Sequence, residues 1–417
     1  MKKLFCCLPA FAALTALAVP RVDLDDVTVD NENGKLTVCY RLQGGPGIVT
    51  MSVQTNAGNG VWITVSGALV KTVSGDANCY VATTGTKSAV WKAYRDWKGT
   101  KLGPDMIRVV LKAYERNAGP DYMAVDLTKT GNGSVSYFED ETALPLPPTD
   151  RIWKTDRLLF KRIRAAFDEF HAGHAVGELG SDNPGFSWTP ETPRRVTLTR
   201  DYYIGVYPVT QAQWTRLGGT NASTHKVACA DCAETADDVA LRPVESVSYA
   251  NVATSSSSAI VMLRERTGCN DFALPTAAEW EYACRAGCAH AYYNGTELET
   301  WNGQQVSENL KPIAWHGGSN DGANGHTHTH AVGRLEPNAF GLYDMLGNVM
   351  EFTRDYFPGD PGSADRMDQS WPNVVEQNAH TVCGGHFDIG AYRCRACCWN
   401  YGYENGAAVV GFRVICY

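Results

Sequence analysis

The chain has 417 residues, a hydrophobic content of 44% and a formal net charge of −8. This length suggests two domains rather than one. The acidic balance argues against a nucleic-acid partner, because such a partner requires a clustered basic surface.

Residues 1–18 have the pattern of a secretory signal peptide. Lys2 and Lys3 form a basic start, an apolar run follows as far as Val19, and small residues precede the expected cleavage point. Cleavage removes both lysines and leaves a net charge of −10. The run is too short for a comfortable membrane span and no later segment is long enough. We therefore expect a secreted, periplasmic or cell-surface protein without a transmembrane segment.

The cysteine content indicates disulfide bonds. Two of the fourteen cysteines, Cys6 and Cys7, lie in the signal peptide, which leaves an even number of twelve in the mature chain. Disulfides are the expected state of cysteines in an exported protein. The spacing does not say which residues pair.

Residues 19–130 are predicted to form a β-sandwich. Short runs that alternate between apolar and polar residues are separated by Gly and Asn turns, which is typical of an antiparallel sandwich of immunoglobulin-like kind. The clearest runs are Leu36–Tyr40, Ile48–Val53 and Ile107–Tyr114. Cys39 and Cys79 either staple this domain or remain buried thiols. No catalytic constellation occurs here, so the domain is interpreted as a spacer or adhesion module.

A linker is expected at residues 131–150, because prolines and small polar residues are frequent there. The second domain, residues 151–417, is rich in Gly and Trp and contains short helix signals. Thr210 and Thr276 each begin a capping-box pattern that predicts a helix start. Residues 248–266 form a third helix signal, weakened by four serines in its middle.

Five segments of the second domain recur in the order known from one protein family. They are Asp201–Thr210; Arg242–Ser248; Leu274–Thr276 with Glu279–Ala283; Asn338–Phe352; and Gly384-Gly385 with Gly411-Phe412-Arg413. Together they resemble the formylglycine-generating enzyme (sulfatase-modifying factor) family. The resemblance implies a mixed α/β domain, related to C-type lectin folds, with little regular secondary structure. The expected fold class of the whole chain is therefore α+β.

A structural calcium site is expected at the turn between Asp344 and Glu351. Two carboxylates and the intervening carbonyls provide the oxygen ligands that calcium accepts. The resemblance implies ligands at Asp344, Gly347, Val349 and Glu351. The alternative is that the two carboxylates only form hydrogen bonds in a tight turn.

The resemblance also implies a second calcium site. It would use Asn309 and Leu310, together with a later loop residue such as Asn320 or Asp321. As at the first site, the proposed ligands are oxygen atoms, which calcium accepts.

The redox site of the family is incomplete in this chain. Family enzymes oxidise a substrate cysteine to formylglycine with a copper(I) ion held by two thiolates, which lie four and nine residues after the second glycine of a Gly-Gly-Ser motif. Here Cys394 occupies the second position, Ile389 occupies the first, and His386 replaces the serine. Isoleucine cannot ligate copper, so copper is not expected. Rescue by Cys383, Cys397 or Cys398 requires a different geometry.

Two further motifs allow more than one interpretation. His326, His328 and His330 share one face if the segment is a strand, as metal ligands do, but the surrounding Gly, Asn and Thr favour an exposed loop. Cys229 and Cys232 have redox or zinc spacing, but a second cysteine pair is lacking, which favours disulfides.

Aromatic residues near the C-terminus either line a recognition surface or pack in the core. They are Phe387, Tyr392, Trp399, Tyr401 and Tyr403. The main hypothesis is an exported, non-catalytic protein that binds a protein or glycan through its C-terminal face. The alternative is a copper-dependent oxidase that converts a substrate cysteine to formylglycine through Cys394 and a second thiol. A purely structural surface protein is the third possibility.

Overall fold

The computed structural model describes residues 19–99, 106–174, 191, 193–228, 235–299, 306–317, 328–356, 366–367, 379–403 and 405–417. The chain divides into two compact units. The first comprises residues up to Thr64 together with Thr72–Arg116, and the second comprises Val65–Lys71 together with Asn117–Tyr417. This division lies earlier in the chain than the boundary near residue 130 that the sequence suggested.

In the first unit, the part of the chain that the structure describes forms two antiparallel sheets and one short α-helix, α1 (Ala93–Asp96). One sheet has the strand order β1-β2-β7-β5. In the other, β3 pairs with β8 along one edge and with β4 and β6 along the other. The strands are β1 (Arg21–Glu32), β2 (Lys35–Gln43), β3 (Gly47–Asn56), β4 (Trp62–Thr64), β5 (Val73–Gly75), β6 (Cys79–Val81), β7 (Gly85–Trp91) and β8 (Ile107–Tyr114). They contain the three runs that the sequence identified.

The hairpin between β1 and β2 shows why this segment folds as it does. Asn33 and Gly34 have φ angles of 54° and 79°, which a two-residue hairpin turn of the primed type requires. Alternate β2 residues from Leu36 to Leu42 are buried, so the period-two pattern puts one strand face in the core.

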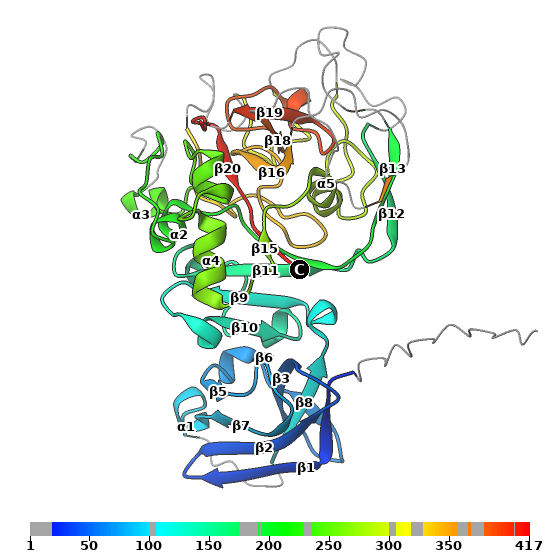
Figure 1. Cartoon of the computed structure of the whole chain (residues 1–417), viewed down its shortest axis with the longest axis vertical. Helices are drawn as coiled ribbons and strands as arrows, with labels where there is room; N and C mark the ends of the chain where they lie inside the picture. The colour runs from blue at the N-terminus through cyan, green and yellow to red at the C-terminus, as the bar shows by residue number, and fades with distance from the viewer. Residues whose placement is uncertain are drawn as a thin grey trace, which may run out of the picture. The chain divides into compact units, whose positions relative to one another are not determined.

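The described residues of the second unit form three sheets and four α-helices. Their strand orders are β10-β9-β11-β14-β21-β15, β12-β13-β17 and β19-β18-β16-β20. Figure 1 shows β10, β9 and β11 side by side in the first of these sheets. The strands are β9 (Tyr122–Asp126), β10 (Val135–Phe138), β11 (Arg157–Ile163), β12 (Asp168–Ala172), β13 (Arg194–Leu198), β14 (Tyr202–Gly205), β15 (Phe272–Ala273), β16 (Met350–Tyr356), β17 (Arg366–Met367), β18 (Ala379–Cys383), β19 (Trp399–Tyr403), β20 (Val410–Phe412) and β21 (Ile415–Cys416). The helices are α2 (Gln211–Arg216), α3 (Ala236–Val239), α4 (Ala259–Thr267) and α5 (Ala277–Arg285).

The segment expected to be a linker is integrated into this second unit. Strand β10 pairs with β9, and β9 pairs with β11, so all three belong to one sheet. The carbonyl of Pro147 accepts a hydrogen bond from the indole of Trp153 at 2.9 Å, and that of Pro148 accepts one from the Tyr207 hydroxyl at 2.9 Å. Proline lacks an N–H donor but keeps its carbonyl acceptor, so a proline-rich segment can still be fixed by the domain.

Both predicted capping boxes are present. Thr210 opens α2 and Thr276 opens α5, each with reciprocal hydrogen bonds to the residue three positions later. The third helix signal is divided into a π-helical turn, Ala250–Thr254, and α4. The serine run causes the break, because Ser258 caps α4 by accepting the N–H of Val261.

The core of the second unit surrounds helix α5, which is buried at all nine positions. It contacts β12, β16 and β18. Trp153, Trp280 and Trp399 are each fully buried. Large aromatic side chains therefore supply apolar area that short helices and strands do not provide. Within the described residues, no helix has the length and apolar character needed to cross a membrane.

Candidate functional site

The turn from Asp344 to Glu351 leads into β16 and contains several positive φ angles. Asp344, Gly347 and Asn348 have φ angles of 52°, 72° and 61°. A Cβ atom at Gly347 would lie 2.1 Å from the carbonyl oxygen of Trp315, so only glycine fits there. The turn carries both Asp344 and Glu351 into the interior, where they are 4% and 0% exposed.

The Glu351 carboxylate forms a buried ion pair with Arg413. Arg413 Nη2 lies 2.9 Å from Oε1 and Arg413 Nε lies 3.0 Å from Oε2. The indole Nε1 of Trp280 donates to Oε2 at 2.7 Å. Each carboxylate oxygen therefore already accepts a hydrogen bond from the protein, and the negative charge is compensated inside the core.

Asp344 lies beside the same arginine. Its Oδ2 accepts the backbone N–H of Gly333 at 2.7 Å, and its Oδ1 accepts from the side-chain amide of Asn348 at 3.3 Å. Burial raises the pKa of the Asp344 carboxyl, while the Gly333 hydrogen bond and the positive charges of Arg413 and Lys154 act in the opposite direction. Two side chains of the protein, Arg413 and Lys154, thus already supply positive charge near the Asp344 carboxyl.

These contacts define what calcium would meet at this turn. The carboxylates and the Gly347 and Val349 carbonyls are ligand types that calcium accepts at about 2.3–2.6 Å. In the observed arrangement, binding an ion through Glu351 requires Arg413 to release at least one carboxylate oxygen. The residue types fit the ion, and a calcium ion would share Glu351 with Arg413.

Asn309 is positioned by a carboxylate that the sequence analysis did not identify. The backbone N–H of Asn309 donates to Glu299 Oε1 at 2.9 Å, and the Ser307 hydroxyl donates to Oε2 at 2.7 Å. Burial acts to raise the pKa of Glu299, but these hydrogen bonds outweigh it and lower the pKa. Leu310 is buried. The positions proposed to complete this site, 320 and 321, lie outside the described residues.

Cys394 packs beneath the two consecutive glycines. A Cβ atom at Gly385, where φ is 70°, would lie 2.5 Å from the Cys394 sulfur. Cys394 is 0% exposed, and burial raises the pKa of its thiol, with a further upward contribution from Cys398. Ile389 is half-buried at the other expected copper-ligand position. Cys394 is therefore a buried thiol, and Cys398 is close enough to contribute to its raised pKa.

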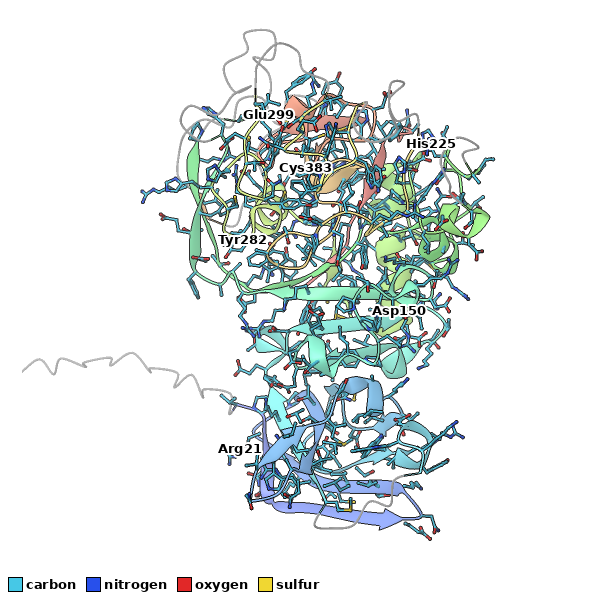
Figure 2. The ribbon with its side chains drawn as sticks, turned by 180° about the vertical axis from the view of Figure 1, so that it is seen from behind. Arg21, Asp150, His225, Tyr282, Glu299 and Cys383 are labelled. Atoms are coloured by element: carbon cyan, nitrogen blue, oxygen red, sulfur yellow. The ribbon has the colours of Figure 1, made fainter. Side chains whose placement is uncertain are left out.

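The remaining thiols of this region are also buried. Cys383, in β18, lies inside the second unit (Figure 2) and is 0% exposed. Cys397 contacts the Arg395 guanidinium at 3.4 Å, and Arg395 forms two 2.8 Å hydrogen bonds to the Glu191 carboxylate. Burial raises the pKa of Cys398 to about 12. Burial of the Cys383, Cys394 and Cys398 thiols disfavours the thiolate, the form in which cysteine binds metals and reacts.

The loop of residues 384–394, here termed the C-terminal loop, is anchored to the rest of the unit by a buried aromatic side chain and by backbone hydrogen bonds. Phe387 is buried, and its N–H donates to the carbonyl of Asn348 at 3.1 Å. The Ile389 carbonyl accepts the N–H of Gly317 at 2.8 Å. Above these anchors lie partly or fully exposed side chains, which we term the C-terminal face: His386, Asp388, Ile389, Tyr392 and Arg393.

His386 is neutral on this face at physiological pH. Burial, followed by the charge of Arg393, lowers the pKa of His386 to about 4. The backbone N–H of Asp388 donates to His386 Nδ1 at 3.2 Å. Since Nδ1 accepts this hydrogen bond, the ring proton is on Nε2, which gives His386 a defined donor.

The structure adds His225 to this region. Its ring lies 5.0 Å from that of Phe387, in an edge arrangement, and it interacts electrostatically with Asp388. Burial lowers the pKa of His225. His225 lies on the periphery of the second unit in Figure 2. No local sequence signal marked it, because its proximity to the C-terminal loop is a tertiary contact.

Some of the aromatic residues near the C-terminus pack in the core, and others are partly exposed, as a recognition surface requires. Phe387 and Trp399 are buried in the core, whereas Tyr392 and Tyr401 are half-buried. The side chain of Tyr403 lies outside the described part.

The histidine segment is only partly described. His328 and His330 are 8% and 2% exposed, with ring centroids 4.7 Å apart, and His330 stacks on Trp315 at 3.9 Å. These two are thus packed rather than displayed in an exposed loop; His326, Cys229 and Cys232 lie outside the described residues. Within the described ranges, no group of three or more His, Cys, Asp or Glu side chains is placed to hold a metal.

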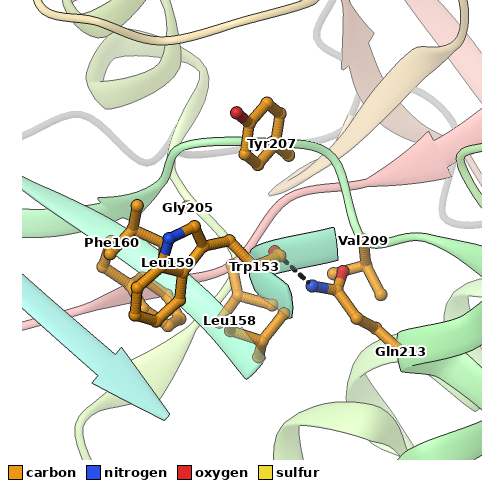
Figure 3. Close-up of a pocket in the computed structure, with 9 residues that line it drawn as sticks. Trp153, Leu158, Leu159, Phe160, Gly205, Tyr207, Val209 and Gln213 are labelled. Carbon is orange, nitrogen blue, oxygen red and sulfur yellow. Dashed lines mark hydrogen bonds between the residues drawn. The ribbon is translucent and has the colours of Figure 1, made fainter. Parts of the chain in front are cut away.

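A small pocket lies away from the C-terminal face, next to α2 (Figure 3). Its cavity volume is about 10 Å³, and it is lined mainly by apolar groups, including Leu158, Phe160 and Val209. Gln213 donates to the Trp153 carbonyl at its rim, at 2.8 Å. Small-molecule sites are typically about 300–1,000 Å³, so this pocket is a packing defect of the core.

Comparisons with known proteins identify the second unit. A model of the sulfatase-modifying factor enzyme 1-like domain matches residues 170–416. A formylglycine-generating enzyme of Mycobacterium tuberculosis is 43% identical over 88 residues, which are 20% of this chain and 27% of that protein. A chaperone protein, LppX of Paenibacillus barcinonensis, is 30% identical over 224 residues, which are 47% of this chain and 77% of that protein.

The extent of these matches differs between relatives. The chain spans about a quarter to two-fifths of the length of the formylglycine-generating enzymes from Mycobacterium tuberculosis and mouse. Among solved structures, Treponema denticola variable protein 1 is 25% identical with a TM-score of 0.48, over 62% of this chain and 95% of that one.

Proposed function

Because the chain belongs to the sulfatase-modifying factor enzyme 1-like family, we propose that it is a secreted member without oxidase activity that binds a protein or glycan through its C-terminal face. The observation that carries the proposal is the incomplete thiolate pair. Ile389 stands at one copper-ligand position, and Cys394 at the other is 0% exposed with a raised thiol pKa. A copper(I) bis-thiolate needs two sulfur ligands and an opening for the substrate sulfur.

The C-terminal face has the construction of a recognition surface. Its backbone is held by buried Phe387, and the segment that follows is held by the bidentate pair of Arg395 with Glu191. Side chains above a fixed backbone lose less entropy on binding than those on a mobile loop. Binding residues are commonly carried by loops on a rigid scaffold.

A protein ligand is favoured over a glycan by the charges on this face. Exposed Asp388 and partly exposed Arg393 provide both signs, and Tyr392 adds an aromatic surface. Opposite charges around an aromatic group suit protein partners, because they set orientation and association rate. A glycan ligand is the other outcome of the binding test.

Copper(I) titration tests the absence of catalysis. The purified mature chain is compared with Cys394→Ser, and oxygen consumption is then followed with a cysteine-containing peptide. We expect neither stoichiometric copper binding nor turnover. Tight binding and turnover that both disappear in Cys394→Ser would establish the oxidase instead.

Selection from a random peptide display library tests protein binding. The informative variant is the double change Asp388→Ala with Arg393→Ala. Its matched control is Arg151→Ala with Asp237→Ala, another oppositely charged surface pair of the same unit. We expect enriched peptides to bind the wild type and the control but not the face variant. Equal binding to all three would contradict the proposal, and binding only to an oligosaccharide panel would assign a glycan.

The oxidase alternative rests on one specific observation. Cys398 interacts electrostatically with Cys394, so a second sulfur is present near Cys394. In this case the pair Cys394 and Cys398 would hold copper(I) after the surrounding chain opens. Loss of copper binding in Cys398→Ser as well as in Cys394→Ser distinguishes this arrangement.

We also propose a structural calcium ion at the Asp344–Glu351 turn, with the Gly347 and Val349 carbonyls as further ligands. The oxygen ligand types support it, and Glu351 would be shared with Arg413. Calcium is expected to raise the unfolding temperature after EDTA treatment, and Asp344→Ala is expected to remove this response. An unfolding temperature that is the same with and without calcium would refute the site.

Asn309 and Leu310 remain a second proposed calcium site. Glu299, which accepts the Asn309 N–H, supplies the additional carboxylate that supports it. Glu299→Gln is expected to reduce calcium stoichiometry by one ion in equilibrium dialysis, and an unchanged stoichiometry would exclude it.

Export and the immunoglobulin-like nature of the first unit are further proposals. The signal-peptide pattern supports cleavage before Val19, and the two antiparallel sheets support a sandwich. N-terminal sequencing of protein recovered from a secreting host checks the cleavage, and a mature chain that begins at Met1 would contradict it.

A further inference from the structure

Cys269 and Cys416 approach each other although 146 residues separate them in the chain. Their sulfur atoms are 3.7 Å apart. Cys269 follows Gly268, the residue that ends α4, and Cys416 lies in β21 at the end of the chain. Cys416 is 3% exposed, whereas Cys269 is half-buried and reachable from solvent.

The backbone holds the two cysteines in this position. Phe272 pairs with Cys416 and Ala273 with Ile415 in the antiparallel contact of β15 with β21. The N–H of Tyr417 donates to the carbonyl of Asp271 at 3.3 Å. Strand pairing and this hydrogen bond therefore bring the backbone segments that carry the two cysteines together.

We propose that Cys269 and Cys416 form a disulfide bond in the mature protein. A disulfide has an S–S length of about 2.05 Å, so forming the bond requires the sulfurs to approach by roughly 1.7 Å through side-chain rotation. This assignment is independent of what the C-terminal face binds.

The bond forms by thiol–disulfide exchange with an oxidised disulfide such as oxidised glutathione. The accessible Cys269 loses its proton and attacks a glutathione sulfur, which releases one reduced glutathione and leaves a mixed disulfide. Cys416 then loses its proton and attacks the Cys269 sulfur, which releases the second glutathione. One S–S bond forms in the protein and one breaks in the oxidant, which takes up the two electrons.

The bond would hold β21, the last strand along the chain, in its place within the six-stranded sheet. Strand β21 is only two residues long and lies between β14 and β15. Arg413, the partner of Glu351, lies three residues before Cys416, and the C-terminal loop lies inside the closed ring. Closing so long a ring reduces the freedom of the unfolded chain more than that of the folded one.

Peptide mapping of the full mature chain tests the proposal. Reduced protein is equilibrated with oxidised and reduced glutathione, alkylated, digested and analysed by mass spectrometry. We expect one peptide pair, linked through Cys269 and Cys416, that is two hydrogen masses lighter than its reduced parts. Alkylation of both residues throughout, or linkage of either one to another cysteine, would overturn the assignment.

Thermal unfolding provides the second readout. Oxidation is expected to raise the unfolding temperature by roughly 5 °C or more. Cys269→Ser and Cys416→Ser should each abolish this increase, whereas Cys288→Ser should retain it. Cys288 is a matched control, because it is half-buried in the same unit and its sulfur contacts the Tyr292 carbonyl at 3.4 Å. If Cys416→Ser does not fold, Cys269→Ser decides alone, and an increase that persists in it contradicts the proposal.

Discussion

The Asp344–Glu351 turn and the C-terminal face are neighbours with opposite physical character. Backbone hydrogen bonds join them, from Gly347 to Gly384 and from Phe387 to Asn348. The turn buries its charges and pairs them within the protein. The face leaves charged groups accessible above an anchored backbone. The difference separates a part of this unit whose charged groups support the fold from a part whose charged groups stay accessible to solvent.

The strongest test of this contrast is Arg413→Met. The change leaves the buried Glu351 carboxylate without its ionic partner, which should destabilise the protein by about 3–5 kcal/mol. Urea denaturation of the wild type and the variant measures the loss. Arg216→Met is the control: its pair with Asp156 has side chains 48% and 38% exposed, so a loss within about 1 kcal/mol is expected. Similar losses in both variants would contradict the distinction.

The boundary between the two regions is tested by Gly385→Ala. The new methyl group meets the Cys394 sulfur and the backbone keeps a positive φ, so a loss of about 2–4 kcal/mol is expected. Gly131→Ala has the same sign of φ but open space around it, and should lose only about 1 kcal/mol. The double variant Gly385→Ala with Cys394→Ala should recover part of the loss. Chemical denaturation would show no recovery if Cys394 were not the obstacle.

The sequence was sufficient where structure is decided locally. Thr210 and Thr276 cap their helices as the spacing predicted, and Asn33 and Gly34 close a hairpin. In each case the residues that make the hydrogen bond, or adopt the special φ, lie within a few positions. The family resemblance supplied the second unit's fold class, because its motifs are ordered along the chain.

The sequence was insufficient where distant segments meet. The proline-rich segment next to β10 was interpreted as a linker, because pairing of β9 with β11 cannot be read from local composition. Similarly, Glu191 and His225 reach the site through tertiary contacts that leave no local pattern. The burial of Cys394 depends on packing beneath Gly385, which spacing alone does not show.

A buried histidine, His380, is expected to make the free energy of unfolding depend on pH. His380 stacks between Tyr249 and Tyr356, and burial lowers its pKa to about 4. The unfolded chain, with a histidine pKa near 6.5, therefore binds the proton more readily. This contribution to stability is fully present above pH 6.5 and decreases by roughly 2–3 kcal/mol as the pH falls to 4. His380→Phe should reduce this slope in denaturation measurements at several pH values, and an unchanged slope would assign it to other groups.

The smallest expected effect on stability concerns the C-terminal face. Asp388→Ala with Arg393→Ala removes side chains that lie above the buried anchors Phe387 and Arg395. Urea denaturation is therefore expected to show a change in the free energy of unfolding of no more than about 0.5 kcal/mol per substitution. The same double variant should lose binding to the selected peptides, so that stability and recognition separate within one loop. A large loss of stability would instead place these side chains among the supports of the fold, and the contrast between the turn and the face would not hold.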